Sequence, residues 1–239
     1  MIRAVVFDFD GLILDSEGPV YQAWAEVYER FGEELSLDFW RTIIGRGAGF
    51  FDPLADLEKR LGRPLEREAI RAEKRLRERE LVEAQPVLPG VHEWREEAAG
   101  AGLKLGVASS SSRSWVLGHL DRLGLDGWDC VRCADDVARP KPDPDVYLAA
   151  LDCLGTAASG ALAVEDSTHG IAAAKAAGLF CVAVPGPLTM ESDLSAADLR
   201  LASLDERRLA EVIPLAERFY SGRQAPLDPT GSLHERAGA

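Results

Sequence analysis

The chain has 239 residues, 46% of them hydrophobic, which is enough to bury the core of one large α/β domain or of a main domain with a smaller insert. Its 40 acidic residues outnumber its 27 basic residues, and the net charge of -13 opposes binding to nucleic acid or to an anionic membrane surface. No segment approaches the roughly 20 apolar residues of a membrane span, and acidic residues at positions 8, 10 and 15 interrupt what would have to be a signal-peptide core. The sequence therefore predicts a cytoplasmic protein without a nucleic-acid or membrane partner.

The first apolar run, residues 2–7, leads directly into Asp-Phe-Asp-Gly at positions 8–11. Successive side chains of a strand point to opposite faces, so Asp8 and Asp10 share a face, and Gly11 lets the backbone turn away. Two carboxylates this close repel each other unless they bind a cation, share a proton or pair with a lysine or arginine. The alternative is a polar turn in which both carboxylates are solvated.

The next part of the chain, residues 16–84, contains no strand-like run and is dominated by amphipathic helical patterns. One pattern predicts a buried helix face formed by Leu65, Ala69, Ala72 and Leu76. A glycine-rich stretch at 45–49 lacks the lysine of a phosphate-binding P-loop, and we expect a loop from which Arg46 reaches a substrate.

Beyond Gly90, apolar runs at 103–108, 161–164 and 180–184 alternate with helical patterns. This order is typical of parallel strands joined by right-handed crossovers, and it predicts a doubly wound α/β sheet. We expect the chain to divide into a core domain at 1–15 and 85–222, an all-α insert at 16–84, and a flexible tail at 223–239.

The four cysteines, at positions 130, 133, 153 and 181, are too few and too scattered for a secreted disulfide framework, so we expect reduced thiols. Cys130 and Cys133 have zinc-knuckle spacing, but no second pair of cysteines or histidines follows them. A zinc site is therefore not expected.

Polar residues follow the later strands too, at the edge where open α/β sheets bind ligands. Ser109 and Ser110 open a serine run before a helix and offer hydroxyl and N–H groups to a phosphate, although capping of that helix would also explain them. Lys141 lies between two prolines before a helix that we expect Asp143 to cap, with Pro144 in its first turn.

The last of these strand ends carries two adjacent acids, Glu165 and Asp166. They would repel each other unless a metal ion or a lysine is near. Together, the four strand ends predict carboxylates, a hydroxyl and a lysine at one edge of one sheet.

In this order, the sites resemble the motifs of the haloacid dehalogenase superfamily: Asp-Phe-Asp-Gly at 8–11, Ser109, Lys141, and Glu-Asp-Ser at 165–167. The resemblance covers residues 2 to about 185, and the helical insert looks like the family's small cap. The chain looks most like the branch that contains β-phosphoglucomutase and small-molecule phosphatases. This resemblance implies a Rossmann-like α/β core with the cap inserted after the first strand.

The resemblance also implies roles for the residues in these motifs. Asp8 would attack the phosphorus of a phosphomonoester to give an aspartyl-phosphate, and Asp10 would act as general acid and base. The phosphoryl oxygens would be held by Ser109, Ser110 and Lys141, and Lys141 would also neutralise Asp8.

A magnesium ion is implied in the same way. Its ligands would be the Asp8 carboxylate, the backbone carbonyl of Asp10, Asp166 and, directly or through water, Glu165. The substrate would also contact Arg46.

The expected activity is hydrolysis of a small phosphorylated metabolite with Mg²⁺. The alternatives are a hexose-phosphate mutase and a catalytically idle binding or regulatory protein on the same scaffold. The mutases resemble the chain at 21–24 but carry a histidine where Val20 stands, which favours a phosphatase. The presence of Asp10 argues against dehalogenation. The sequence does not define an oligomeric state and is compatible with a monomer.

Overall fold

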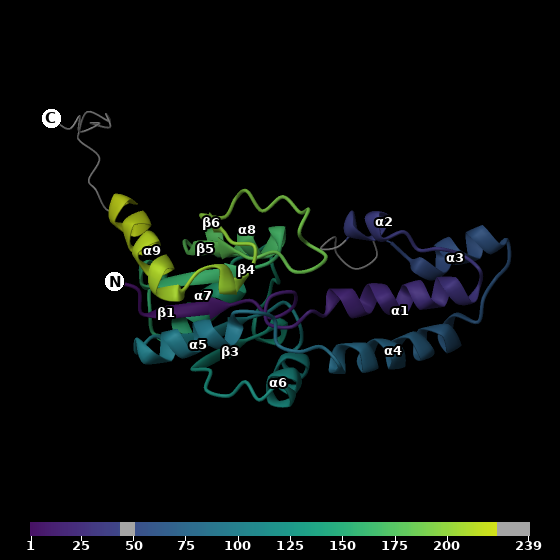
Figure 1. Cartoon of the computed structure of the whole chain (residues 1–239), viewed down its shortest axis with the longest axis horizontal. Coiled ribbons are helices and arrows are strands. Elements are labelled where there is room, and N and C mark those ends of the chain that lie inside the picture. The colour runs from purple at the N-terminus through teal and green to yellow at the C-terminus, as the bar shows by residue number, and fades with distance from the viewer. Residues whose placement is uncertain (44–50, 224–239) are drawn as a thin grey trace, which may run out of the picture.

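In the computed structural model, which describes residues 1–43 and 51–223, six strands form one sheet (Figure 1). In spatial order they are β3 (Cys130–Arg132), β2 (Lys104–Ala108), β1 (Ala4–Phe7), β4 (Ala161–Glu165), β5 (Phe180–Ala183) and β6 (Leu199–Arg200). All neighbouring strands are parallel, and the chain moves outward from β1 to one side and then, from β4, to the other. The doubly wound α/β sheet predicted from the sequence is confirmed.

Helices cover both faces of this sheet. They are α5 (Val91–Gly100), α6 (Arg113–Arg122), α7 (Asp145–Leu154), α8 (Thr168–Ala176) and α9 (Leu209–Arg223). Alternate residues of β1 point to opposite faces: Val5 and Phe7 pack with α5, α6 and α9, whereas Ala4 and Val6 pack with α7 and α8. Burial of both faces explains why the strands read as continuous apolar runs.

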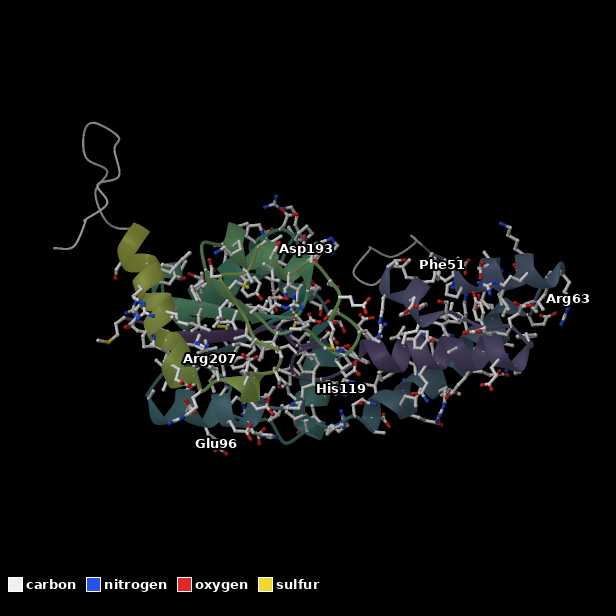
Figure 2. The ribbon with its side chains drawn as sticks, turned by 45° about the horizontal axis from the view of Figure 1, so that its top comes forward. Phe51, Arg63, Glu96, His119, Asp193 and Arg207 are labelled. Atoms are coloured by element: carbon white, nitrogen blue, oxygen red, sulfur yellow. A yellow bond between two sulfur atoms is a disulfide. The ribbon has the colours of Figure 1, made fainter. Side chains whose placement is uncertain are left out.

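A second group of helices lies between β1 and α5. It consists of α1 (Glu17–Arg30), α2 (Leu37–Arg41), α3 (Pro53–Leu61) and α4 (Arg67–Glu83). These helices share a hydrophobic cluster of their own, which includes Tyr28, Leu54 and Leu57. Figure 2 shows the side chains of both parts, with Phe51 among these helices and Arg207 beside the sheet. We refer to α1–α4 as the cap helices.

The cap helices occupy the span predicted for the all-α insert, and the domain boundaries at 15/16 and 84/85 stay a prediction. Arg46 and most of the predicted tail, residues 224–239, lie outside the described residues. Within the described ranges, no helix is long and apolar enough to cross a membrane. The cytoplasmic location stays a prediction as well.

The buried face of α4 differs from the predicted one. Ile70, Lys74 and Val82 are its buried residues, whereas Leu76 is 62% exposed and the two alanines of the predicted stripe are also exposed. A lysine occupies the buried face because Glu78, one turn further on, pairs with it. A count of apolar residues does not anticipate such a pair. The predicted face is wrong for Ala69, Ala72 and Leu76, whereas Leu65, just before α4, packs against the cap cluster.

A disulfide joins Cys130 of β3 to Cys153 of α7, so the expectation of reduced thiols is wrong for this pair. The two cysteines are 23 residues apart in sequence and meet because α7 packs against β3. Cys133 and Cys181 are free and buried. Spacing along the chain does not reveal a pair that forms only when a crossover helix docks on its strand.

The start of α7 also differs from the prediction. Pro144 is its N-cap residue, and the helix begins at Asp145 without a side-chain cap. Asp143 instead forms an ion pair with Arg139, with 3.0 Å between the charged atoms. The predicted capping by Asp143 is therefore wrong.

Candidate active site

Four predicted site residues meet at the carboxyl edge of the sheet. Phe7, the last residue of β1, is in register with Val107 of β2 and with Val164 of β4. Asp8 therefore leaves the sheet beside Ser109 and beside the pair formed by Glu165 and Asp166. The Asp8 N–H still donates to the carbonyl of Val164, at 2.9 Å, so the carboxylate is fixed by the sheet itself.

Lys141 reaches this edge from the loop before α7. Its Nζ lies 2.5 Å from Asp8 Oδ1 and 2.6 Å from Glu165 Oε1, and all three side chains are buried. Burial opposes the lysine's charge, but the two carboxylates outweigh that effect and raise the pKa of Lys141 above its ordinary value. The ammonium group is therefore held charged beside Asp8.

Glu165 is held by protein donors on both of its oxygens. Oε1 accepts from Lys141 and from the Tyr147 hydroxyl at 2.7 Å, and Oε2 accepts from the N–H of Asp166 and from the N–H and hydroxyl of Ser167. Gly170 in α8 leaves room for this carboxylate, because a Cβ there would lie 1.9 Å from it. The arrangement fixes the position of Glu165 and, through it, that of Lys141.

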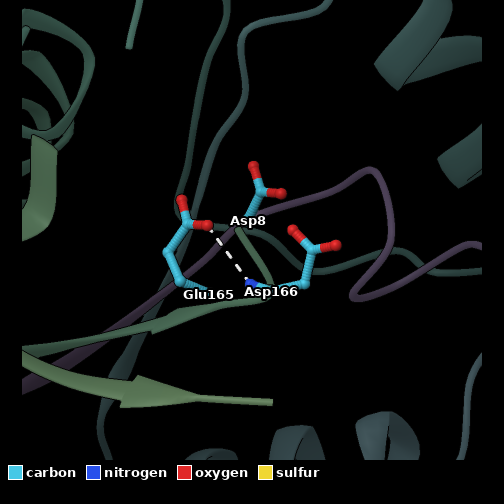
Figure 3. A group of neighbouring side chains, drawn as sticks. All are labelled: Asp8, Glu165 and Asp166. Carbon is cyan, nitrogen blue, oxygen red and sulfur yellow. Dashed lines mark hydrogen bonds between the residues drawn. The ribbon is translucent and has the colours of Figure 1, made fainter. Parts of the chain in front are cut away.

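The carboxylates of Asp8, Glu165 and Asp166 are buried, and each offers an oxygen within 4.8 Å of the others (Figure 3). Burial raises the pKa of Asp8 to about 7 against the opposing effect of Lys141. Burial and the neighbouring carboxylates raise the pKa of Asp166 well above its ordinary value. Three carboxylates and one lysine meet here, and buried hard oxygen donors of this kind suit Mg²⁺.

Gly11 is required by the same cluster. Its φ of +81° lies in the left-handed region, and a Cβ there would lie 2.0 Å from Asp166 Oδ2. Any side chain at this position would displace Asp166. Glycine at this turn therefore allows the left-handed backbone conformation and also leaves room for the Asp166 carboxylate.

Asp10 is bound by donors from three segments. Its carboxylate accepts from the hydroxyls of Ser16, at 2.8 Å, and Ser111, at 2.6 Å, and from Nε1 of Trp115, at 2.9 Å. Ser109 is buried and lies further from Asp10, at 3.4 Å. Three good donors fix the orientation of this carboxylate.

The structure thus adds residues that sequence reasoning missed. Ser16, Ser111 and Trp115 orient Asp10, and Tyr147 supports Glu165. Ser111 belongs to the serine run that the sequence analysis noted. Nothing in the spacing of Trp115 or Tyr147 could have identified them, because both come from helices whose rotation about their axes is set by packing.

A cavity of about 720 Å³ opens above these groups. From the sheet edge it is lined by Asp8, Asp10, Ser110, Lys141 and Asp166, and from the cap helices by Glu17, Val20 and Glu78. The predicted contact of Arg46 falls outside the described residues. The cavity has the size of a site for a small metabolite.

Comparisons with known proteins agree with this geometry. Residues 5–184 match the family model described as haloacid dehalogenase-like hydrolase. The protein of Bacillus subtilis named "Putative phosphatase YhcW" is 42% identical over 211 residues, which cover 88% of this chain and 96% of that one. The phosphorylated carbohydrates phosphatase of Thermotoga maritima is 32% identical and covers 74% of this chain and 82% of its own.

A solved structure with the same fold is CbbY from Rhodobacter sphaeroides in complex with xylulose-(1,5)bisphosphate. It is 30% identical, with a TM-score of 0.67, and the match covers 88% of this chain and 98% of that chain. The structure described as "putative beta-phosphoglucomutase from Thermotoga maritima" also matches, with a TM-score of 0.71 at 26% identity, over 92% of this chain and 99% of that one. With its site and fold in agreement, the chain belongs to the haloacid dehalogenase-like hydrolase family, in the β-phosphoglucomutase branch, and is a phosphoric monoester hydrolase.

Proposed function

We propose that the protein hydrolyses the phosphomonoester of a small metabolite through an aspartyl-phosphate on Asp8, with Mg²⁺ as cofactor. The observation that supports this most directly is the contact of Asp8 with Lys141 beside Asp166, all buried at one sheet edge and open to one cavity. A carboxylate held by a charged lysine is poised to attack an electrophile carrying negative charge. The phosphatase relatives support the same reaction class.

In this reaction Asp8 displaces the alcohol from phosphorus, and the covalent intermediate divides one difficult displacement into two easier ones. Lys141 offers its charge to the phosphoryl oxygens, and Ser109 and Ser110 offer hydroxyl and N–H groups from the end of β2. We assign Glu165 to holding Lys141, because both of its oxygens already accept hydrogen bonds from the protein.

Asp10 donates a proton to the leaving alcohol and then takes one from the water that hydrolyses the intermediate. Its hydrogen bonds to Ser16, Ser111 and Trp115 orient the carboxylate beside Asp8. When Asp10 acts on the substrate, its carboxylate gives up some of these hydrogen bonds and contacts the leaving oxygen or the attacking water instead.

The residues fit a magnesium ion. Asp8, Asp166 and the backbone carbonyl of Asp10 would hold it, and the buried carboxylates of Asp8, Glu165 and Asp166 outnumber the one lysine beside them. When bound, Mg²⁺ draws negative charge from the phosphoryl oxygens and lets the two carboxylates stay ionised together.

The substrate class follows from relatives that act on phosphorylated carbohydrates or bind a sugar bisphosphate. A hexose-phosphate mutase remains the alternative activity because structures titled as β-phosphoglucomutases share the fold. Val20 lines the cavity at the position where the family resemblance implies a histidine in the mutases, which supports hydrolysis.

The test is to incubate the purified protein with Mg²⁺ and a panel of sugar, polyol and nucleotide phosphates, and to measure both inorganic phosphate and isomerised product. We expect phosphate release that is lost with EDTA and in Asp8→Asn. Isomerisation without phosphate release would show a mutase. No turnover of any ester, in a protein that is folded by circular dichroism, would overturn the proposed activity.

A further inference from the structure

Glu17 is a carboxylate of the cap helices that faces the catalytic cavity without a protein partner. It is the first residue of α1, is half-buried, and lines the same cavity as Asp8 and Asp10. Within residues 1–43 and 51–223 its side chain makes no hydrogen bond or ion pair. Burial, together with the carboxylates of Asp10, Asp15 and Glu78, raises its pKa to about 7. Glu17 therefore offers the cavity an acceptor that no described side chain occupies.

Glu78 is the second carboxylate on this wall, on α4 opposite the start of α1. It forms an ion pair with Lys74, one turn before it. Lys74 is buried and lies 5.2 Å from the ring centre of Trp24, so its charge is directed into the cap rather than into the cavity. The lysine therefore pairs with Glu78 from the cap side, and Glu78 but not Lys74 lines the cavity.

The cationic side chains among the described lining residues are few. Lys141 is committed to Asp8 and Glu165, and His169 is exposed. Lys74 does not line the cavity, so an anionic group on the leaving alcohol would lie against Glu17 and Glu78, with Lys141 and His169 as the cationic side chains among the described lining residues. Hydroxyl or ammonium groups at the same place would donate to Glu17.

We propose that Glu17 and Glu78 form an electrostatic filter, which selects monophosphates whose alcohol part carries hydrogen-bond donors and rejects those with a second anionic group. This inference rests on the proposed phosphatase function. It predicts a substrate range unlike the bisphosphate seen in the CbbY complex, although the folds match. The filter recognises the charge of the leaving alcohol and does not select one particular sugar.

The test uses esters that differ only in that charge. Turnover is first established with p-nitrophenyl phosphate, and kcat/KM is then measured for glucitol 6-phosphate against 6-phosphogluconate and for xylulose 5-phosphate against xylulose 1,5-bisphosphate. For esters that are not turned over, the inhibition constant against p-nitrophenyl phosphate replaces kcat/KM. We expect the anionic member of each pair to be disfavoured by about tenfold or more, the scale of one like-charge contact in a partly buried site.

Two charge-neutralising variants locate the filter. Glu17→Gln keeps an oxygen acceptor and removes the charge, so the ratio of kcat/KM between neutral and anionic esters should shrink, because the anionic esters are used better than by the wild type. Glu78→Gln removes the second carboxylate charge on this wall and should also shrink that ratio. Glu80→Gln is the matched control: it lies on the same helix, pairs with Arg77 and does not line the cavity, and its discrimination should equal that of the wild type.

The outcomes separate the two proposals. If p-nitrophenyl phosphate and every ester are inert, the phosphatase function fails and the filter fails with it. If turnover occurs but the anionic and neutral esters are used equally, or if neither Glu17→Gln nor Glu78→Gln changes their ratio, the filter is overturned and the phosphatase function stands.

Discussion

The two walls of the catalytic cavity are built differently. On the sheet side, Asp8, Lys141 and Glu165 are buried and satisfy one another at 2.5 and 2.6 Å. On the cap side, Glu17 has no partner among the described residues, and Val20 presents an apolar surface. On the sheet side the protein itself positions the reacting carboxylate, whereas on the cap side Glu17 is open to a group of the substrate. Reaction chemistry and substrate choice therefore belong to separate parts of the molecule.

The difference also has an energetic side. The ions of the sheet edge are removed from water, so breaking one contact leaves a buried charge without a partner. The cap helices carry many ion pairs at the surface, such as Arg77 with Glu26, where each contributes little. Substitutions at the sheet edge should therefore affect both activity and folding, and substitutions of exposed cap residues should affect neither strongly.

The largest effect is expected from Asp8→Asn. An amide is a poor nucleophile, so phosphate release should fall by about ten-thousand-fold or more, as in other enzymes that lose a nucleophile. Steady-state assays of released phosphate measure it. Asp15→Asn is the control, because Asp15 follows the same strand but lines a different cavity, and it should keep most of the activity. Equal rates in the two variants would contradict the role of Asp8.

Lys141→Met should affect activity and stability together. The substitution leaves Asp8 and Glu165 without their cation, and removal of one partner of a buried pair costs about 3–5 kcal/mol. Because the pKa of Asp8 is about 7 already in the wild type, a proton can replace the lysine at lower pH. Lys141 lowers the pKa of Asp8, so its removal raises that pKa further above 7, and the variant takes up the proton at a higher pH than the wild type. The loss in the free energy of unfolding should therefore be largest at high pH and shrink as the pH falls toward about 7.

The matched control for this variant is Arg139→Met, two residues away in the same loop. Arg139 is 62% exposed and pairs with Asp143 and Asp145 at the surface, so its removal should cost about 1 kcal/mol or less. Urea unfolding of both variants at several pH values compares them. A cost for Lys141→Met as small as that for Arg139→Met would show that the buried pair does not hold the site together.

Much of the sheet side could be predicted from the sequence. Asp8, Ser109 and Asp166 each follow an apolar strand run, and the carboxyl ends of parallel strands meet at one edge. Lys141 could be found because two prolines flank it in a loop before a helix. The sequence therefore predicts a site residue wherever its position is set by the strand that it follows.

The cap side could not be predicted in this way. Which face of α4 is buried depends on how the helix is rotated against α1. The buried face includes Lys74, which pairs with Glu78, so the spacing of apolar residues alone predicted the wrong face. Trp115 reaches Asp10 from a helix for the same kind of reason. The Cys130–Cys153 disulfide depends on the docking of α7 on β3, which the order of elements along the chain does not determine.

A smaller effect is expected from Trp115→Phe, which removes the indole N–H that binds Asp10 at 2.9 Å. A less well oriented acid should slow the hydrolysis of alkyl phosphates by about tenfold and that of p-nitrophenyl phosphate much less, because nitrophenolate leaves without a proton. The ratio of the two rates measures the effect. Trp128→Phe is the control, since the buried indole N–H of Trp128 has no acceptor within the described residues. A uniform loss on both substrates would contradict the positioning role.

The smallest effect is expected from Mg²⁺ on the stability of the folded protein. A cation held by Asp8 and Asp166 should raise the melting temperature by a few degrees, about the size expected at saturating ligand. The pKa of Asp8, about 7 in the folded protein, lies above its ordinary value of 3.8. The folded state therefore retains a proton that the metal must displace below about pH 7, and the increase should grow from about pH 6 to about pH 8.

Melting curves recorded with Mg²⁺ and with EDTA at each pH measure this dependence. The Asp166→Asn variant should lose most of the increase. A shift that is independent of pH, or that survives in Asp166→Asn, would show that the ion binds elsewhere.

The most direct test is to identify the phosphorylated residue itself. The protein is mixed with a turned-over phosphate ester and Mg²⁺, quenched in acid and reduced with borohydride, which converts an aspartyl-phosphate to homoserine; peptides are then sequenced by mass spectrometry. We expect homoserine at position 8 in the wild type and none in Asp8→Asn. Turnover with an unmodified Asp8, or modification of another residue, would contradict the central role of Asp8.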